Sequence, residues 1–255
     1  MKGSRFFQST GFIVLVFLYL PIFVLVINSF NESRFGGVWE GFSLKWYEKL
    51  MVERAVWQAL YNSLTIAGIT TIVTTILGTT AALAMQKYYT FLQKTHYAIM
   101  YLPLVIPDVL MGVSLLLFFV SLSIDLGLAT VCIAHITFCV SYVTMLVRSR
   151  LQNFDYTLIE AALDLGASSW DVFIRILVPH LWPALFAAAL LTFTLSLDDF
   201  VITFFVVGPG VTTLPIYVYS MIKFGSPQLI NALSVLLLTT TFGIVWLTHR
   251  LLEKK

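Results

Sequence analysis

The chain has 255 residues, of which 59% are hydrophobic and only 11% are charged, and its formal net charge is +2. A soluble globular domain carries about 25% charged residues, so this chain has too few to cover a water-facing surface. It is expected to be an integral membrane protein, and the small net charge with no basic tract argues against disorder and nucleic-acid binding.

Six apolar segments are long enough to cross a bilayer, which takes about 20 residues each. They are Thr10–Ser29, Asn62–Met85, Tyr97–Leu122, Leu126–Val147, Leu181–Val207 and Leu229–Thr248. Barrel strands would alternate over about ten residues, so these unbroken runs predict an all-α membrane protein. The first run is long for a secretory signal and no small-residue cleavage site follows it, so we expect an uncleaved first span.

Lysine and arginine residues predict the orientation, because cytoplasmic loops are enriched in them. With both termini in the cytoplasm, the inner side holds Lys2, Arg5, Lys87, Lys94, Arg148, Arg150, Arg175, Arg250, Lys254 and Lys255. The outer side then holds half as many, namely Arg34, Lys45, Lys49, Arg54 and Lys223. We therefore predict cytoplasmic termini, an arrangement that also places the polar segment around Glu160 in the cytoplasm.

The loop between the first two predicted spans is rich in aromatic residues. Between Asn31 and Trp57 they are Trp39, Phe42, Trp46, Tyr47 and Trp57. Aromatic side chains of this kind anchor interfacial helices at the lipid headgroups. The alternative is that this surface receives an extracytoplasmic partner.

The third predicted span carries two prolines followed by an acidic residue, at Pro103, Pro107 and Asp108. Proline has no N–H to donate to the carbonyl four residues earlier, so the helix is expected to be kinked or interrupted. Such breaks are tolerated at membrane depth only against protein or a wet cavity, and they mark transport sites. An ordinary proline kink is the alternative.

The fifth predicted span contains two adjacent carboxylates, Asp198 and Asp199. Insertion scales assign about 2.5–3.5 kcal/mol to one Asp at the centre of a membrane helix. Adjacent residues on a helix point about 100° apart. We expect one carboxylate to face a substrate path while the other pairs with a neighbouring helix; the alternative is that both are structural. His135, alone in the fourth span, is interpreted as a packing or hydrogen-bonding residue.

A polar segment from Thr157 to Pro179 separates the fourth and fifth predicted spans. Good helix formers run to Leu165, Gly166 supplies the break that a helix C-terminus tolerates best, and Ser168 with Asp171 has the spacing of a capping box. The pattern predicts two short helices meeting at Gly166. A plain amphipathic linker at the lipid interface is the alternative.

The sequence also limits the chemistry. It has no Gly-Lys dipeptide and hence no Walker A phosphate loop, and neither H-E-x-x-H nor G-x-S-x-G occurs. The four His residues are scattered and do not predict a metal site. Ionised, Asp108, Asp198 and Asp199 would attract a cation such as a polyamine, and candidate cation–π partners are Trp46, Phe200 and Tyr219.

The segment Glu160-Ala161-Ala162, with Gly166 four residues further on and Ile176–Pro179 behind it, resembles the EAA loop of permease subunits of ABC importers. In that family the loop docks into a cleft on the cytoplasmic ATPase. The resemblance implies a coupling role for Glu160, Ala161, Ala162, Asp164 and Gly166. Val178 stands where the wider motif usually has Leu, which is a conservative departure.

A wider resemblance, to the C-type permease of spermidine/putrescine ABC importers, covers nearly the whole chain. It is carried by Asn28–Asn31, Trp46-Tyr47, Pro107-Asp108, Ser196–Asp199 and Gly208-Pro209. It implies a six-helix, type I importer permease of MetI-like architecture in the bacterial inner membrane, non-catalytic and without a cofactor of its own. It also implies a second homologous permease, an ATP-binding subunit homodimer carrying ATP and Mg, and a periplasmic polyamine-binding protein.

The expected organisation is a first helix and periplasmic loop over residues 1–58, a permease core over 59–250, and a short cytoplasmic tail over 251–255. Two other functions remain open. One is an importer for another small solute, although an anion path would want Lys or Arg inside the spans, and none is found there. The other is an ion-coupled transporter or a membrane scaffold.

Overall fold

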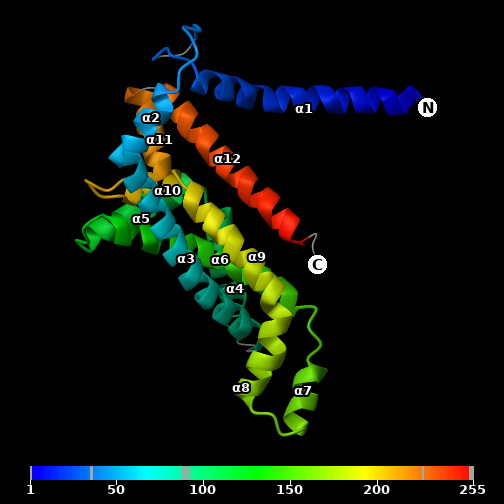
Figure 1. The fold of residues 1–255 in the computed structure, drawn as a ribbon. Coiled ribbons are helices and arrows are strands. Elements are labelled where there is room, and N and C mark those ends of the chain that lie inside the picture. Colours follow the sequence, from blue (N-terminus) through cyan, green and yellow to red (C-terminus); the bar gives the residue numbers. More distant parts are fainter. Residues whose placement is uncertain (1, 35–36, 88–90, 92, 226, 253–255) are drawn as a thin grey trace. The chain divides into compact units, whose positions relative to one another are not determined.

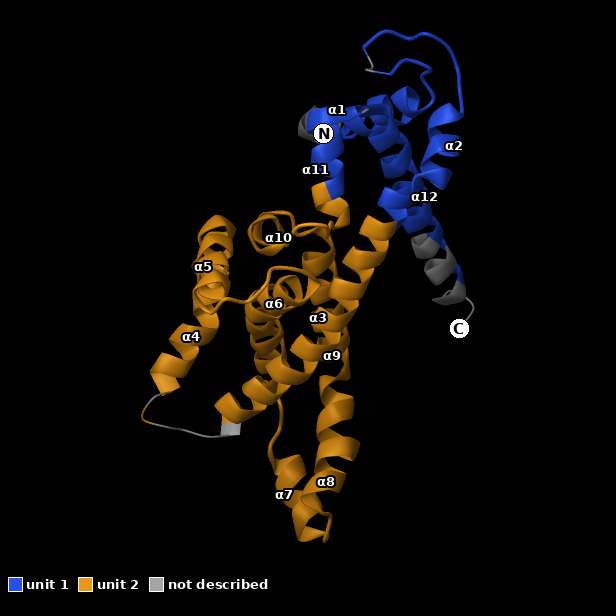
Figure 2. Cartoon of the chain, turned by 90° about the vertical axis from the view of Figure 1, so that its left-hand side faces the viewer, with its two compact units in different colours: residues 1–57, 217–255 blue, residues 58–216 orange. Residues whose placement is uncertain are grey.

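A computed structural model describes residues 2–34, 37–87, 91, 93–225 and 227–252, and within these ranges every named element is a helix (Figure 1). The predicted all-α fold is confirmed. The chain forms two compact units, unit 1 from residues 1–57 and 217–255 and unit 2 from residues 58–216 (Figure 2). Residues 253–255 of the predicted tail lie outside the described part of the chain.

Four described helical segments are long and apolar enough to cross a membrane. Three of them lie in α1 (Lys2–Ser29), α3 (Arg54–Lys87) and α6 (Leu128–Leu151). The fourth is the helical segment Ser169–Asp198, whose last part is α9 (Val178–Asp198). A fifth is obtained if α4 (Gln93–Val105) and α5 (Asp108–Ser121) count as one bent span. In α12 (Pro227–Leu252) the apolar part, Pro227–Gly243, is shorter, so the six-span count stays a prediction.

The expected interruption of the third span is present, and it lies at Pro107. The axes of α4 and α5 meet at 110°, with Pro107 directly before the first residue of α5 and in an extended conformation (ψ 136°). Pro103 lies inside α4. The sharp bend follows from Pro107 because the residue before a proline is pushed out of the helical region, which ends α4 just ahead of it.

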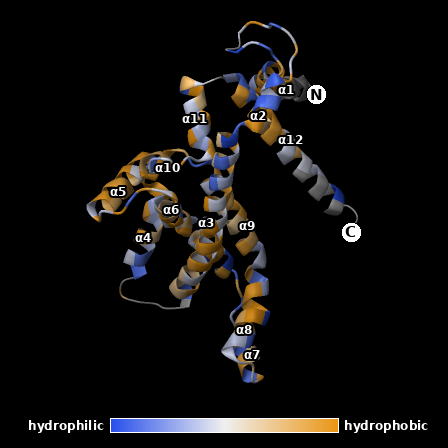
Figure 3. Cartoon of the chain, turned by 60° about the vertical axis from the view of Figure 1, so that its left-hand side comes forward, coloured by the Kyte–Doolittle hydropathy of each residue, from blue (hydrophilic) through white to orange (hydrophobic). Residues whose placement is uncertain are grey.

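The core of unit 2 forms around α6. Towards one end, Val131 and Cys139 of α6 pack with Phe119 of α5 and with Ile202 and Val206 of the short helix α10 (Val201–Val206). Towards the other end, α6 packs against α9 in a second cluster that includes Val147 and Leu181. Apolar residues run along α5 and α9 in Figure 3, as expected for helices surrounded by lipid and by other helices.

Unit 1 contains α1, α2 (Lys45–Val52), most of α11 (Leu214–Phe224) and α12. Asn31 organises the loop after α1: its side-chain Nδ2 donates to the Val38 carbonyl at 2.7 Å, and its Oδ1 accepts from the Glu40 N–H at 3.0 Å. Trp46 of α2 donates from Nε1 to the Asn31 carbonyl at 2.9 Å. The aromatic loop thus contains the helix α2, and Trp46 of this helix connects it to the part of the loop around Asn31.

Candidate functional site

The three predicted carboxylates lie at two interrupted helices of unit 2. Asp108 is the first residue of α5, directly after the bend at Pro107. Asp198 is the last residue of α9, and Asp199 lies in the break before α10. The side chains of Asp108 and Asp198 are exposed on this chain, whereas only 9% of the Asp199 side chain is exposed. Of the three carboxylates, Asp199 alone is largely buried within this chain.

The two interrupted helices pack closely. Gly112 lies one turn after Asp108 on α5, and a Cβ atom there would lie 2.7 Å from the Phe205 ring and 3.3 Å from the Ile202 Cα of α10. The absence of a side chain at Gly112 thus lets α5 approach the backbone of α10. The helix that starts at Asp108 and the helix that follows Asp199 consequently form one packed pair.

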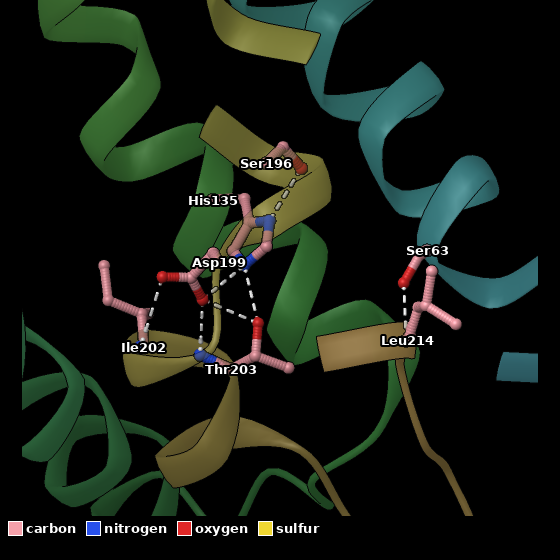
Figure 4. Close-up of polar contacts among 7 residues, drawn as sticks. All are labelled: Ser63, His135, Ser196, Asp199, Ile202, Thr203 and Leu214. Atoms are coloured by element: carbon pink, nitrogen blue, oxygen red, sulfur yellow. Dashed lines mark hydrogen bonds and ion pairs between the residues drawn. The ribbon is translucent and has the colours of Figure 1, made fainter. Parts of the chain in front are cut away.

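Asp199 is held by donors from α6 and α10 (Figure 4). Its Oδ2 accepts hydrogen bonds from the Thr203 backbone N–H at 2.8 Å and the Thr203 hydroxyl at 2.7 Å. Its Oδ1 accepts from the Ile202 N–H at 3.4 Å, and His135 Nε2 lies 3.2 Å from Oδ2. The carboxylate therefore caps the first turn of α10 and pairs with a neighbouring helix, as one member of the acidic pair was expected to do.

His135 has contacts with three elements. From α6, its ring places Nδ1 at 2.7 Å from the Ser196 hydroxyl of α9 and Nε2 at 2.9 Å from the Thr203 hydroxyl of α10. The side chain is 1% exposed. The sequence interpretation of His135 as a hydrogen-bonding residue agrees with this geometry, but the pairing with Asp199 was not predicted. The usable signal was that ionisable residues inside membrane segments pair with one another.

The three candidate aromatic residues differ in their surroundings. Trp46 is buried, and the amino groups of Lys45 and Lys49 lie 5.2 and 5.9 Å from the centroid of its ring. Phe200 follows Asp199 directly, and its ring centroid lies 5.5 Å from that of Phe204. Tyr219 is exposed on α11. Trp46 and Tyr219 belong to unit 1, so the structure groups only Phe200 with the carboxylates of unit 2.

The segment after α6 forms the two expected short helices, α7 (Thr157–Asp164) and α8 (Ser169–Val172). Between them Gly166 adopts φ +85°, a left-handed conformation that favours glycine. The Ser168 hydroxyl accepts from the Asp171 N–H at 3.1 Å, which confirms the capping interaction. A π-helical turn, Phe173–Leu177, then joins α8 to α9.

Asp155 fixes the start of this segment. Its Oδ1 accepts from the Thr157 N–H at 3.0 Å and from the Thr157 hydroxyl at 2.7 Å. These hydrogen bonds favour the ionised form and lower the pKa of Asp155. The carboxylate therefore stays charged at neutral pH next to the positive end of the α7 dipole.

The surface of α7 and its turn is exposed. Glu160, Ala161, Asp164 and Gly166 are exposed and Ala162 is half-buried. Four large apolar side chains of the same segment are also exposed, namely Leu158, Leu163, Leu165 and Trp170. An apolar surface of this kind next to acidic residues is typical of a protein-binding site.

A model of the protein family described as "Binding-protein-dependent transport system inner membrane component" matches residues 74–252. The putrescine transport system permease protein PotI of Escherichia coli K12 is 45% identical over 236 residues, covering 90% of this chain and 84% of that protein. The spermidine/putrescine transport system permease protein PotC of Haemophilus influenzae is 38% identical over 253 residues, covering 98% of both chains.

Solved structures agree in fold. A permease chain from a bacterial ABC transporter involved in the import of the acidic polysaccharide alginate superposes with a TM-score of 0.76 at 16% identity, covering 97% of this chain and 93% of that one. The MetNI methionine ABC transporter, in an inward-facing conformation, gives 0.61 at 20% identity, covering 80% and 95%. With its apolar spans, this chain is a multi-pass membrane protein and a member of the binding-protein-dependent transport system inner membrane component family.

Proposed function

We propose that the chain is the permease subunit of an ATP-driven importer that moves polyamines across the bacterial inner membrane. The observation that carries this proposal is the pair of exposed carboxylates, Asp108 and Asp198, at the breaks of two apolar helices that pack together. Curated relatives named as putrescine and spermidine/putrescine permeases, 38–45% identical over most of the chain, support the same cargo.

The cargo path contains carboxylates because polyamines are cations. An Asp facing lipid at the centre of a span costs about 2.5–3.5 kcal/mol, so Asp108 and Asp198 are better placed beside water and a passing ammonium group. Phe200, which follows Asp199 in the same unit, offers an aromatic face that contributes about 0.5–2 kcal/mol of cation–π attraction. Trp46, buried beneath two lysines, is assigned to the fold of the outer loop.

The ATPase binds the cytoplasmic segment from Glu160 to Gly166. The exposed Leu163, Leu165 and Trp170 supply apolar contact area, and Glu160 and Asp164 supply charge. The complete importer contains an ATP-binding subunit homodimer with ATP and Mg, a second homologous permease, and a periplasmic polyamine-binding protein. Both termini of this chain lie in the cytoplasm.

Reconstitution of the complex in liposomes tests the function. ATP hydrolysis is expected to rise when the external binding protein is loaded with spermidine or putrescine, and labelled polyamine is expected to enter the vesicles. Stimulation by a different class of solute, with no polyamine uptake, would identify an importer for another cargo. Polyamine uptake without the ATPase subunit would identify an ion-coupled transporter.

Asp108→Asn and Asp198→Asn test the path. Each is expected to lower polyamine uptake by at least about tenfold, since an amide loses the charge attraction for an ammonium group. Both side chains are exposed, so the amount of assembled complex is expected to stay unchanged. Asp125→Asn, an exposed acidic residue of the same unit, is the matched control. Normal uptake by both test variants would remove these residues from the path.

A further inference from the structure

Two neighbouring carboxylates at the end of α9 have opposite surroundings. Asp198 is exposed, whereas Asp199 is nearly buried. If both were free beside a cation path, a polyamine ammonium group would be held by two adjacent negative charges rather than one. Hydrogen bonds within the chain hold Asp199 apart from Asp198, and His135 is the residue from α6 that contacts it.

The contacts of Asp199 within the chain fall mainly on one carboxylate oxygen, Oδ2. The Thr203 N–H and hydroxyl bind Oδ2, and the Ile202 N–H lies near Oδ1. His135 Nε2 lies 3.2 Å from Asp199 Oδ2 and 2.9 Å from the Thr203 hydroxyl oxygen, and because an ionised carboxylate can only accept, it favours the tautomer with the proton on Nε2. Oδ2 thus has three close partners, and because only 9% of the side chain is exposed, the carboxylate is shielded from a cation in the path.

The His135 ring is fixed on both sides. Ser196, one turn before Asp199 on α9, lies 2.7 Å from Nδ1. When the neutral ring carries its proton on Nε2, Nδ1 accepts a hydrogen bond from the Ser196 hydroxyl. When the ring is charged, Nδ1 donates to that hydroxyl. Nε2 is a donor to Asp199 in both of these states. The ring is 1% exposed and packs edge-on against Phe138, with the ring centroids 5.5 Å apart. Rotation of the imidazole away from Asp199 is therefore prevented by packing.

We propose that His135 is a positioning residue for transport: it holds the Asp199 carboxylate inside the bundle, so that Asp198 alone of the adjacent pair meets the cationic cargo. This inference rests on the proposed function. Releasing Asp199 would add a second negative charge to the path. The passing cation would then be retained longer, and turnover would fall more than the apparent affinity for the loaded binding protein.

Chemical labelling of carboxylates tests the shielding directly and needs no cargo. The assembled complex is treated with a water-soluble carbodiimide and glycine ethyl ester, and labels at positions 198 and 199 are separated by fragment mass spectrometry. In the unaltered complex we expect at least about tenfold more label on Asp198 than on Asp199. In His135→Ala the label on Asp199 is expected to approach that on Asp198, and His135→Gln, which keeps a side-chain N–H donor, is expected to restore protection.

If His135→Ala does not yield a folded complex, Thr203→Val removes a second donor from Asp199 with little change of volume. It is expected to raise the Asp199 label in the same way. His96→Ala, at an exposed histidine of the same unit, is the matched control and is expected to leave the labelling unchanged. Equal labelling of Asp198 and Asp199 in the unaltered complex would overturn the proposal.

Uptake kinetics separate positioning from mere support of the fold. His135→Ala is expected to lower the maximal uptake rate by at least about tenfold while the KM for the loaded binding protein changes by less than about twofold. The double variant His135→Ala with Asp199→Asn is expected to transport at least about threefold faster than His135→Ala alone, because the released charge is gone. A double variant no faster than the single one would overturn the proposal.

The two proposals fail in distinguishable ways. If the unaltered complex moves no polyamine, the proposed cargo is wrong, while the labelling of Asp199 still reports whether His135 shields it. If the unaltered complex moves polyamine and the His135 variants behave as His96→Ala does, the cargo stands and the positioning role is refuted.

Discussion

Gly208→Val is expected to prevent the chain from accumulating as a folded membrane protein. A Cβ atom on Gly208 would overlap the carbonyl group of Leu126, which is backbone and has no rotamer to adopt instead. At this point the Thr130 hydroxyl of α6 donates a hydrogen bond to the Val206 carbonyl of α10, at 2.8 Å. Separating them would break the contact of α6 with α10, at a cost of more than about 3 kcal/mol.

Gly127→Ala is the matched control for this prediction. Gly127 lies across the same contact, yet among the residues that the structure describes none has an atom within 4 Å of a Cβ built there. Its effect on stability is expected to be within about 0.5 kcal/mol. The measurements are the yield of monodisperse complex and its melting temperature. A Gly208→Val complex with the yield and melting temperature of the Gly127→Ala complex would contradict the packing argument.

Gly166→Val is expected to abolish polyamine uptake while the complex still assembles. Gly166 has φ +85°, and a β-branched residue in that conformation is strained by about 1–2 kcal/mol. No atom of the described residues lies within 4 Å of a Cβ built at this position, so the strain alters the angle between α7 and α8 rather than the bundle. We expect ATP hydrolysis to continue without stimulation by the loaded binding protein, and uptake to fall by at least about tenfold.

Gly166→Asn separates backbone strain from contact with the ATPase. Asparagine tolerates the left-handed conformation. If backbone strain is what lowers uptake in Gly166→Val, the Gly166→Asn complex is expected to keep most of its polyamine uptake. Loss of uptake in both variants, with assembly intact, would instead indicate that any side chain at this position obstructs the docked ATPase. Unchanged uptake in Gly166→Val would remove this turn from the coupling mechanism.

The break at Pro107 and the two short helices around Gly166 were predictable because their causes are local. The break at Pro107 follows from the proline ring and its effect on the preceding residue, the left-handed Gly166 from one missing Cβ, and the Ser168 cap from a spacing of three residues. These features depend on neighbours along the chain, which a sequence displays directly.

The environment of the carboxylates was not predictable in the same way. Asp198 and Asp199 look alike in sequence, but the second is bound by His135, which lies 64 residues earlier, and by the first turn of α10. The prediction treated this segment as one continuous span from Leu181 to Val207, whereas α9 ends at Asp198 and α10 begins at Val201. Which of two adjacent residues faces inward depends on that break, and the contact of Asp199 with His135 depends on the packing of α6 against α10, which the sequence does not display.

The π-helical turn at Phe173–Leu177 has a consequence for how this polypeptide can change over generations. Such a turn closes its hydrogen bonds between residues five apart and therefore holds one residue more than an α-helical turn. Deleting that residue would rotate α8 about 100° relative to α9 without touching the bundle. A single residue in this turn thus sets which side of α8 faces the surface that we propose binds the ATPase, while the membrane-spanning part of α9 stays as it is.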